Sequence, residues 1–319
     1  MRPAAYLIFA ATALLQAHAQ PYAPPRTPDG RPDLQGTWTN SSITMLERTN
    51  PSFSLILSPE QVRTLEAQRF QMERAQNAPS DAEAGAPQDR NTAAGYNAFW
   101  LDRGKSVAVV NGTARSSWIT EPASGKMPIS DAGQALIAAI LSKRNEDGPE
   151  GLNPADRCLV ASRGSGGPPM LNNIYNNTYL IVQTNDHVMI NVEMMHDARI
   201  IRMGEAHKPG ELKQWLGDSV GEWDGDTLVV KTRNWHPLHG GYEPVFLSEQ
   251  ATVTERFART GPDELTYSFE VDDPGFYSQT WKGEMVFTTS PGDIYEFACH
   301  EGNHALEGIL RGARRHGRP

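Results

Sequence analysis

Cysteine, basic charge and long apolar runs are scarce in this sequence. Its 319 residues include 2 Cys and 29 Lys or Arg against 38 Asp or Glu, for a formal net charge of −9. Phosphate binding requires a concentrated basic face, and no Lys/Arg stripe occurs, so we expect no nucleic-acid partner. After residue 19, no apolar run approaches the ~20 residues that a membrane-spanning helix needs. The hydrophobic fraction of 39% excludes a membrane bundle, and the charged fraction of 21% is typical of a soluble globular protein.

The first 19 residues are typical of a secretory signal. An apolar run over residues 4–15 follows a basic start, and Ala17-His18-Ala19 forms a small-x-small cleavage site. The apolar run is too short to cross a bilayer. The sequence therefore predicts a periplasmic or secreted protein whose mature chain begins near Gln20.

The predicted compartment determines how the two cysteines are interpreted. In an oxidising environment a pair of cysteines more often forms a structural disulfide than a metal site or a nucleophile. We therefore expect a Cys158–Cys299 disulfide, with two free buried thiols as the alternative.

Helix signals are found in two segments before Cys158. Ser58 precedes Pro59 in the order typical of a helix start, and apolar residues at helical spacing continue to about Ala75. This pattern predicts one exposed helix. A second helix is predicted to start near Ser130-Asp131 and to end before Asn145.

The segments around the first helix lack regular periodicity. Residues 20–33 are proline-rich, which favours an extended leader, and residues 76–95 have the composition of a mobile loop. We expect residues 20–110 to pack on a β-barrel domain of residues 111–319, so that the two parts form one globular unit.

Short runs rich in Val, Ile, Tyr, Thr and Phe, separated by turn signals, follow Cys158. The predicted strands are Tyr179–Thr184, Val188–Met195, Arg199–Met203, Thr227–Thr232, Ala251–Phe257, Glu264–Val271, Gln279–Thr288 and Ile294–Cys299. Strands joined by tight turns without helices indicate an antiparallel meander. Because closure removes exposed edges, we predict a mainly β fold, a lipocalin-like antiparallel barrel or strongly curved sheet with N-terminal helical decoration. A β-sandwich is the alternative.

Several motifs together resemble those of a large group of exported, mostly uncharacterised bacterial proteins that open with TPDGKPDLSGxW. The matching segments are Pro28–Trp38, Tyr96–Gly104, Thr113–Pro128, Asp156–Cys158, Ile181–Thr184, Glu193–Ile201, Trp215–Val230, Glu255–Phe257 and Tyr295–Asn303. They cover nearly the whole mature chain. The resemblance implies export and draws attention to these segments, and the chemistry must be argued from the residues.

The segment from Glu193 to Arg199 is the first candidate site. Alternation along Val188–Met195 separates an apolar face from a mixed face that carries Asn191 and Glu193, as expected of a barrel wall with a functional interior. His196 would be the acid or base, Asp197 its orienting partner, Glu193 a second acid–base group, and Arg199 the stabiliser of developing negative charge. The alternative is structural: Asp197 caps a hairpin, His196 is solvated, and Glu193 pairs with Arg199.

A second candidate is His300-Glu301-Gly302-Asn303-His304, which matches the His-Glu-x-x-His pattern of zinc peptidases. That chemistry needs both imidazoles on one helical face, whereas this segment follows a predicted strand and contains Gly302. The resembling group usually has an aromatic residue in place of His304. We therefore assign no metal and no cofactor, keep His300 and Glu301 as catalytic candidates, and treat a zinc-dependent hydrolase as a secondary alternative.

Aromatic and basic residues elsewhere are candidates for substrate binding, namely Trp100, Arg103 and Trp215 beside Asn191. Asp218-Ser219 either orients a substrate hydroxyl or shapes a tight loop, and turn chemistry favours the loop. The Gly-rich segment 162–169 lacks the Lys and the strand-to-helix setting of a phosphate-binding loop.

These patterns predict an exported enzyme that performs cofactor-free acid–base chemistry on a small polar or aromatic substrate in a barrel cavity. The reaction would be a hydrolysis, an elimination or an isomerisation. A non-catalytic barrel that binds a small molecule is the alternative.

Overall fold

The computed structural model describes residues 22–77, 101–144, 148–161, 164–238 and 244–315. The predicted signal at residues 1–19, Trp100 and most of the loop predicted at 76–95 lie outside the described residues. Within the described ranges, every helix is too short or too polar to cross a membrane.

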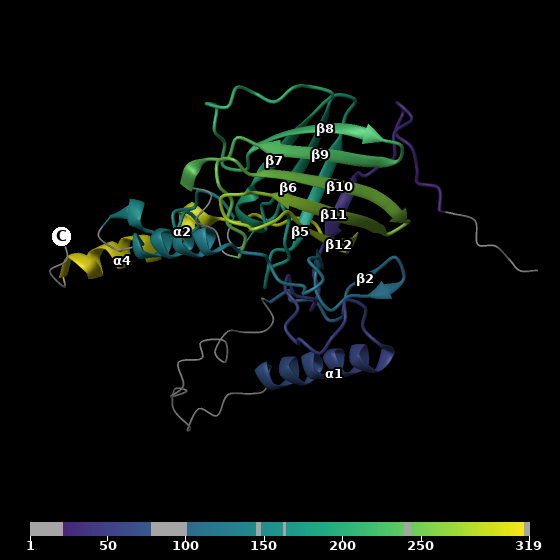
Figure 1. Ribbon diagram of the computed structural model, residues 1–319, viewed down its shortest axis with the longest axis horizontal. Helices are drawn as coiled ribbons and strands as arrows, with labels where there is room; N and C mark the ends of the chain where they lie inside the picture. Colours follow the sequence, from purple (N-terminus) through teal and green to yellow (C-terminus); the bar gives the residue numbers. More distant parts are fainter. Residues whose placement is uncertain (1–21, 78–100, 145–147, 162–163, 239–243, 316–319) are drawn as a thin grey trace, which may run out of the picture.

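Nine strands form a closed barrel (Figure 1). In order around the barrel they are β1 (Gly36–Thr39), β5 (Thr178–Gln183), β6 (His187–Val192), β7 (Ala198–Met203), β8 (Asp218–Asp224), β9 (Thr227–Arg233), β10 (Thr252–Gly261), β11 (Glu264–Asp272) and β12 (Trp281–Thr289). Pairing of β1 with β12 closes the circle. The predicted lipocalin-like barrel is therefore confirmed, and the sandwich alternative is wrong. The predicted barrel domain began at residue 111, but β1 lies before that boundary. Residues on both sides of the predicted boundary therefore form the barrel.

All neighbouring pairs around the barrel are antiparallel except β7 and β8, which are parallel. Residues 204–217 must therefore return along the barrel before β8 begins. This long connection replaces the tight loop that we predicted around Asp218-Ser219. The predicted loop is wrong because Gly221 does not form a turn. It lies within β8, where the strand packs closely on β7: a Cβ on Gly221 would lie 2.7 Å from Met203 Sδ.

The strand predicted at Ile294–Cys299 is also wrong, since residues 294–298 are irregular and a short helix, α3 (Cys299–Gly302), follows. α4 (His304–Arg315) completes the described chain and was not predicted. Leu306, Ile309, Leu310 and Ala313 at helical spacing were the available signal for α4.

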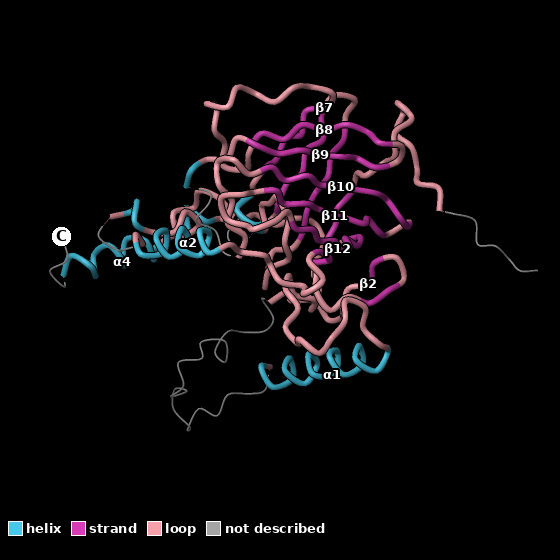
Figure 2. Tube along the Cα trace, in the orientation of Figure 1, coloured by secondary structure: helices cyan, strands magenta, loops and turns pink. Residues whose placement is uncertain are grey.

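The other helices match their predictions. α1 (Pro59–Gln76) begins at a capping box between Ser58 and Gln61 and buries none of its residues, and α2 (Asp131–Ser142) is capped by Ser130. Figure 2 shows α1 apart from the nine barrel strands, with α2 and α4 extending from another side of the barrel. Three short strands lie outside the nine-strand barrel, β2 (Val109–Val110), β3 (Thr113–Ala114) and β4 (Ile119–Glu121), and β4 pairs with β12.

Apolar side chains alternate into the barrel and form its core. On β6 the buried residues are Val188, Ile190 and Val192, so Asn191 lies on the outer face. The polar interior expected from this strand is wrong, because burial of the apolar face removes more apolar surface from water. The interior does contain charge, but it comes from Arg199 on β7 and Glu255 on β10.

The two ends of the barrel differ. At one end, the turn end, short connections join the strands, and the leader is fixed by a bidentate contact of Arg26 with Asp226 at 2.7 and 2.8 Å. At the other, the loop end, long connections converge. Residues 164–171, which we call the plug, are almost completely buried there, with Ser165 and Met170 fully inaccessible to solvent.

The predicted disulfide between Cys158 and Cys299 is confirmed, with Cα atoms 5.8 Å apart. It ties the chain that leads into the plug to α3. Nearby, Asn303 Nδ2 donates to Asp156 O at 2.8 Å. The segment between the barrel and α4 is thereby attached to the loop end.

Candidate functional site

A small cavity lies at the loop end, between the plug and two neighbouring loops. It is lined by Val160, Ala161, Gly164, Gly166, Gly167, Pro168, Pro169, Leu216, Val245 and Leu247. Its volume of about 20 Å³ is enough for roughly one water molecule. Inside the strands lie large, fully buried side chains such as Trp281, Tyr267 and Phe287, whereas this cavity lies at the loop end.

Glycine allows the plug to enter this crowded site. Gly167 has a φ of 61°, and a Cβ there would lie 2.6 Å from Met170 Cγ. A Cβ on Gly166 would lie 3.1 Å from Asp197 Oδ2 and 3.2 Å from Leu216 Cδ2. The Gly-rich segment therefore closes the barrel, a role that its composition alone did not reveal.

Asp197 is the ionisable group beside the cavity. Its Oδ2 accepts a hydrogen bond from Ala161 N at 2.7 Å, and Ala161 and Gly166 both line the cavity. Burial raises the pKa of the Asp197 carboxyl group to about 6, and the hydrogen bond from Ala161 only partly opposes this effect. A carboxyl group with such a pKa can both release and accept a proton near neutral pH.

The structure separates Asp197 from its predicted partner His196. Both follow β6 in a 3₁₀ turn in which Met195 and His196 have positive φ values of 63° and 52°. His196 is exposed, and its ring accepts a hydrogen bond from Phe297 N at 3.0 Å. Asp197 turns toward Ala161 instead, so the two side chains have different partners.

Glu193 holds the base of the same turn. Its side chain is 8% exposed and accepts from Thr178 N at 3.2 Å, while its own N–H donates to Thr178 O at 2.9 Å. These contacts tie the turn to β5. Glu193 therefore has a backbone partner, so the pairing with Arg199 that the structural alternative proposed is wrong.

Arg199 lies inside the barrel, paired with Glu255. Its Nη1 and Nη2 donate to the two Glu255 oxygens at 3.1 and 2.6 Å, and both side chains are almost completely buried. Tyr267 Oη donates to Glu255 Oε1 at 2.8 Å and accepts from Met170 N at 3.0 Å. Sequence reasoning missed Glu255 and Tyr267, although alternation places Glu255 on the same face as Val253 and Phe257.

The remaining predicted residues lie elsewhere. His300 and Glu301 are exposed on α3, and His304 begins the separate helix α4. Trp215 stacks on His236, with ring centroids 4.1 Å apart, and Arg103 is half-buried near α1, where Arg69 Nε donates to Gly104 O at 3.2 Å. In the part of the chain that the structure describes, no three His, Cys, Asp or Glu side chains are grouped so as to hold a metal ion.

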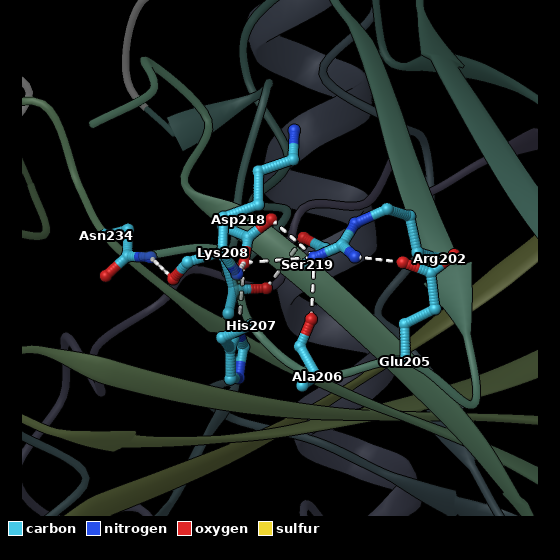
Figure 3. Close-up of polar contacts among 9 residues, drawn as sticks. Arg202, Glu205, Ala206, His207, Lys208, Asp218, Ser219 and Asn234 are labelled. Atoms are coloured by element: carbon cyan, nitrogen blue, oxygen red, sulfur yellow. Dashed lines mark hydrogen bonds and ion pairs between the residues drawn. The ribbon is translucent and has the colours of Figure 1, made fainter. Parts of the chain in front are cut away.

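A second polar cluster surrounds Asp218 at the start of β8 (Figure 3). Asp218 accepts from Arg202 Nη2 at 3.0 Å and from Lys208 N at 2.8 Å, and its Oδ2 lies 3.1 Å from His207 Nδ1. Arg202 also donates to Ala206 O at 3.0 Å. These bonds fasten the connection between β7 and β8, which carries Leu216 to the cavity.

The fold and this site define a class: a closed β-barrel with a plugged loop end and a desolvated carboxyl group beside a small apolar cavity. Comparison with protein families, curated proteins and solved structures finds no match to this chain.

Proposed function

We propose that this protein is an enzyme that performs general acid–base chemistry at the loop end, with Asp197 as the group that exchanges the proton. The observation that carries the proposal is the desolvated Asp197 carboxyl group, whose pKa is about 6, at the edge of the cavity. Proton transfer is most effective when the catalytic pKa lies near the working pH. Hydrolysis, elimination and isomerisation all use such a group, and none of these requires a cofactor to move the proton.

The cavity walls indicate the chemical class of the substrate. Aliphatic side chains, glycine and proline form its lining, so the group that enters is small and uncharged, either apolar or aromatic. Any group larger than a water molecule must displace part of the lining. Asp197 would then meet the substrate at the edge of an apolar surface, where water competes least for its proton.

The test compares Asp197→Asn with the wild-type protein in a screen of small aromatic and aliphatic esters, lactones and hydroxy acids. We expect at least one of these to be turned over, and Asp197→Asn to reduce the rate by about 100-fold or more. Asp186→Asn is the matched control, because Asp186 is an exposed aspartate at the turn end. Turnover that survives in Asp197→Asn would contradict the proposal.

Non-catalytic binding is the second candidate function. The apolar lining favours it, because the cavity presents apolar contact area and, among the described residues, a single carboxyl group at its edge. Thermal unfolding in the presence of small aromatic compounds is the measurement. A rise in melting temperature without conversion of the compound would favour a binding protein over an enzyme.

We also propose that the protein is exported, on the basis of its first 19 residues and of its resemblance to exported proteins. Expression of the full chain in a Gram-negative bacterium, followed by fractionation and N-terminal sequencing, tests this. Recovery from the periplasm with Gln20 as the first residue is expected. An uncleaved chain in the cytoplasm would contradict it.

A further inference from the structure

Three buried tyrosines reach the backbone of the segments that form the cavity. Tyr179 Oη donates to Ser165 O at 3.2 Å, and Tyr267 Oη accepts from Met170 N at 3.0 Å. Between these two attachment points lie four residues that line the cavity, Gly166 to Pro169. The plug is thus held at both ends by hydroxyl groups that belong to the barrel.

The third tyrosine reaches the opposite wall. Tyr277 Oη donates to Phe246 O at 3.0 Å, and the residues on either side of Phe246, Val245 and Leu247, both line the cavity. Tyrosine hydroxyl groups therefore bind the backbone of the plug and of the wall formed by Val245 and Leu247.

The plug offers few other ways to be fixed. Pro168 and Pro169 have no N–H, so this stretch cannot form a strand ladder with the barrel. Inside the plug, Gly167 N and Leu171 N both donate to Gly164 O, at 3.0 and 3.1 Å. These bonds shape the plug without attaching it to the strands. Attachment comes from the tyrosines and from Asn40 Nδ2, which donates to Met170 O at 3.3 Å.

The hydroxyl groups are themselves held in place. Tyr267 donates to Glu255, which is bound by Arg199, and Tyr179 accepts from Asn40 Nδ2 at 3.3 Å. Burial raises the pKa of all three phenols above the ordinary value. They remain protonated, so Tyr179 and Tyr277 stay available as donors.

We propose that Tyr179, Tyr267 and Tyr277 are positioning residues of the loop-end cavity, which hold the plug and the facing wall close enough to keep water from Asp197. The inference rests on the proposed function, because Asp197 is the proposed proton-transfer group. It extends that function by assigning the geometry of the site to residues that do not touch the cavity through their side chains.

The test replaces each tyrosine by phenylalanine in the mature protein, so that the ring remains and only the hydroxyl is lost. The pKa of Asp197 is measured by NMR titration of its carboxyl carbon. We expect Tyr267→Phe and Tyr179→Phe to lower this pKa from about 6 toward the ordinary ~3.9, because the loosened plug admits water. Hydrogen exchange of the Met170 amide should accelerate at least ~10-fold in Tyr267→Phe, while amides within β10 and β11 stay protected.

Thr44→Val is the matched control. The Thr44 hydroxyl is also buried, accepts from Ala108 N at 3.0 Å and donates to Arg115 O at 3.2 Å, but neither segment lines the cavity. This variant should leave the Asp197 pKa unchanged. If Tyr267→Phe does not fold, Tyr179→Phe and Tyr277→Phe still test the proposal. Tyr277→Phe loses its bond to Phe246 O, and Tyr179→Phe loses its bond to Ser165 O and the bond it accepts from Asn40 Nδ2.

The outcomes separate the two proposals. If Asp197 titrates near 6 in the wild type and keeps that value in every tyrosine variant, the positioning role is overturned and the proposed function stands. If Asp197 has an ordinary pKa in the wild type, the proposed function loses its basis. In that case only the hydrogen-exchange rate of the Met170 amide tests whether Tyr267 holds the plug.

Discussion

Asp197 and Asp218 begin from similar local bonding and end in opposite electrostatic states. Each accepts a hydrogen bond from a backbone N–H, from Ala161 at 2.7 Å and from Lys208 at 2.8 Å. For Asp218, burial raises the pKa, but the bonds from Lys208, Arg202 and His207 outweigh it and the net shift is downward. For Asp197, burial prevails and the pKa rises. A neighbouring cation thus separates a carboxylate that holds the fold from a carboxyl group that can exchange a proton.

The largest expected effect is the loss of stability on truncation of Asp218, compared with that on truncation of Asp197. Asp218→Ala should lower the free energy of unfolding by about 3 kcal/mol, because it breaks a partly buried ion pair and leaves Lys208 N without an acceptor. At pH 4, where the Asp197 carboxyl group is protonated in the folded state, Asp197→Ala should cost about 1 kcal/mol, the value of one hydrogen bond. Urea unfolding followed by tryptophan fluorescence measures both. Equal losses of unfolding free energy in the two variants would mean that the ion pair with Arg202 does not make Asp218 more stabilising than Asp197.

The second prediction concerns pH. The folded pKa of Asp197, about 6, exceeds the unfolded value of ~3.9, so the folded state binds more protons between these values. The stability that Asp197 contributes is complete below pH ~3.9 and is lost as the pH rises through 6. Relative to the wild type, Asp197→Asn should therefore gain about 2–3 kcal/mol between pH 4 and 7, at 1.36 kcal/mol per pKa unit.

Asp218 should show the opposite dependence. Its folded pKa is lowered, so its contribution is present above pH ~3.9 and is lost as the pH falls through the folded pKa. The penalty of Asp218→Asn should accordingly shrink in acid. Denaturant titrations at several pH values measure both trends. A stability difference that is constant with pH for either variant would refute the corresponding shift.

The third prediction concerns substitutions that should reverse the direction of the pKa shift of each aspartate. Arg202→Met removes the cation beside Asp218 but keeps an apolar side chain of similar length, so burial should then dominate and raise the Asp218 pKa. Conversely, Leu216→Lys places an ammonium group near Gly166 and Asp197, which should lower the Asp197 pKa by about 1–3 units. NMR titration of the two carboxyl carbons decides. Lys143→Met, far from both sites on the chain, serves as the control.

The smallest expected effect comes from filling space beside each aspartate. Gly166→Ala should cost about 1 kcal/mol, because its Cβ would press on Asp197 Oδ2 at 3.1 Å and on Leu216 Cδ2 at 3.2 Å. Gly210→Ala, near the Asp218 cluster, meets only Asn234 Oδ1 at 3.8 Å and should stay within ~0.5 kcal/mol of the wild type. Thermal unfolding measures the pair. A larger loss in Gly210→Ala would show that close packing matters more at the Asp218 cluster than at the cavity.

Local patterns were sufficient for much of the fold. The capping signal at Ser58 and the alternation along β6 and β11 depend on neighbours in the chain, and the structure follows them. β8 was missed because Gly221 resembles a turn residue locally, whereas its reason is a contact with Met203 on a parallel strand. Glu255 could have been predicted as a charge on an apolar face, but its pairing with Arg199 could not.

The candidate site was only partly predictable for the same reason. Asp197 was selected from its place beside His196, yet its pKa depends on Ala161 and on a plug that enters from a distant loop. His196 and Asp197 are adjacent in the chain, but the positive φ of His196 turns the backbone so that the side chains meet different partners.

The sequence by itself determined the mainly β class, the two N-terminal helices and the cysteine pair, because periodicity, capping and cysteine content are local or compositional properties. Only the tertiary structure decided which carboxylate meets a cation, where the barrel is plugged, and which face of each strand is buried. Those outcomes depend on contacts between residues far apart in the chain, and burial changes the free energy of a charge only once those contacts exist.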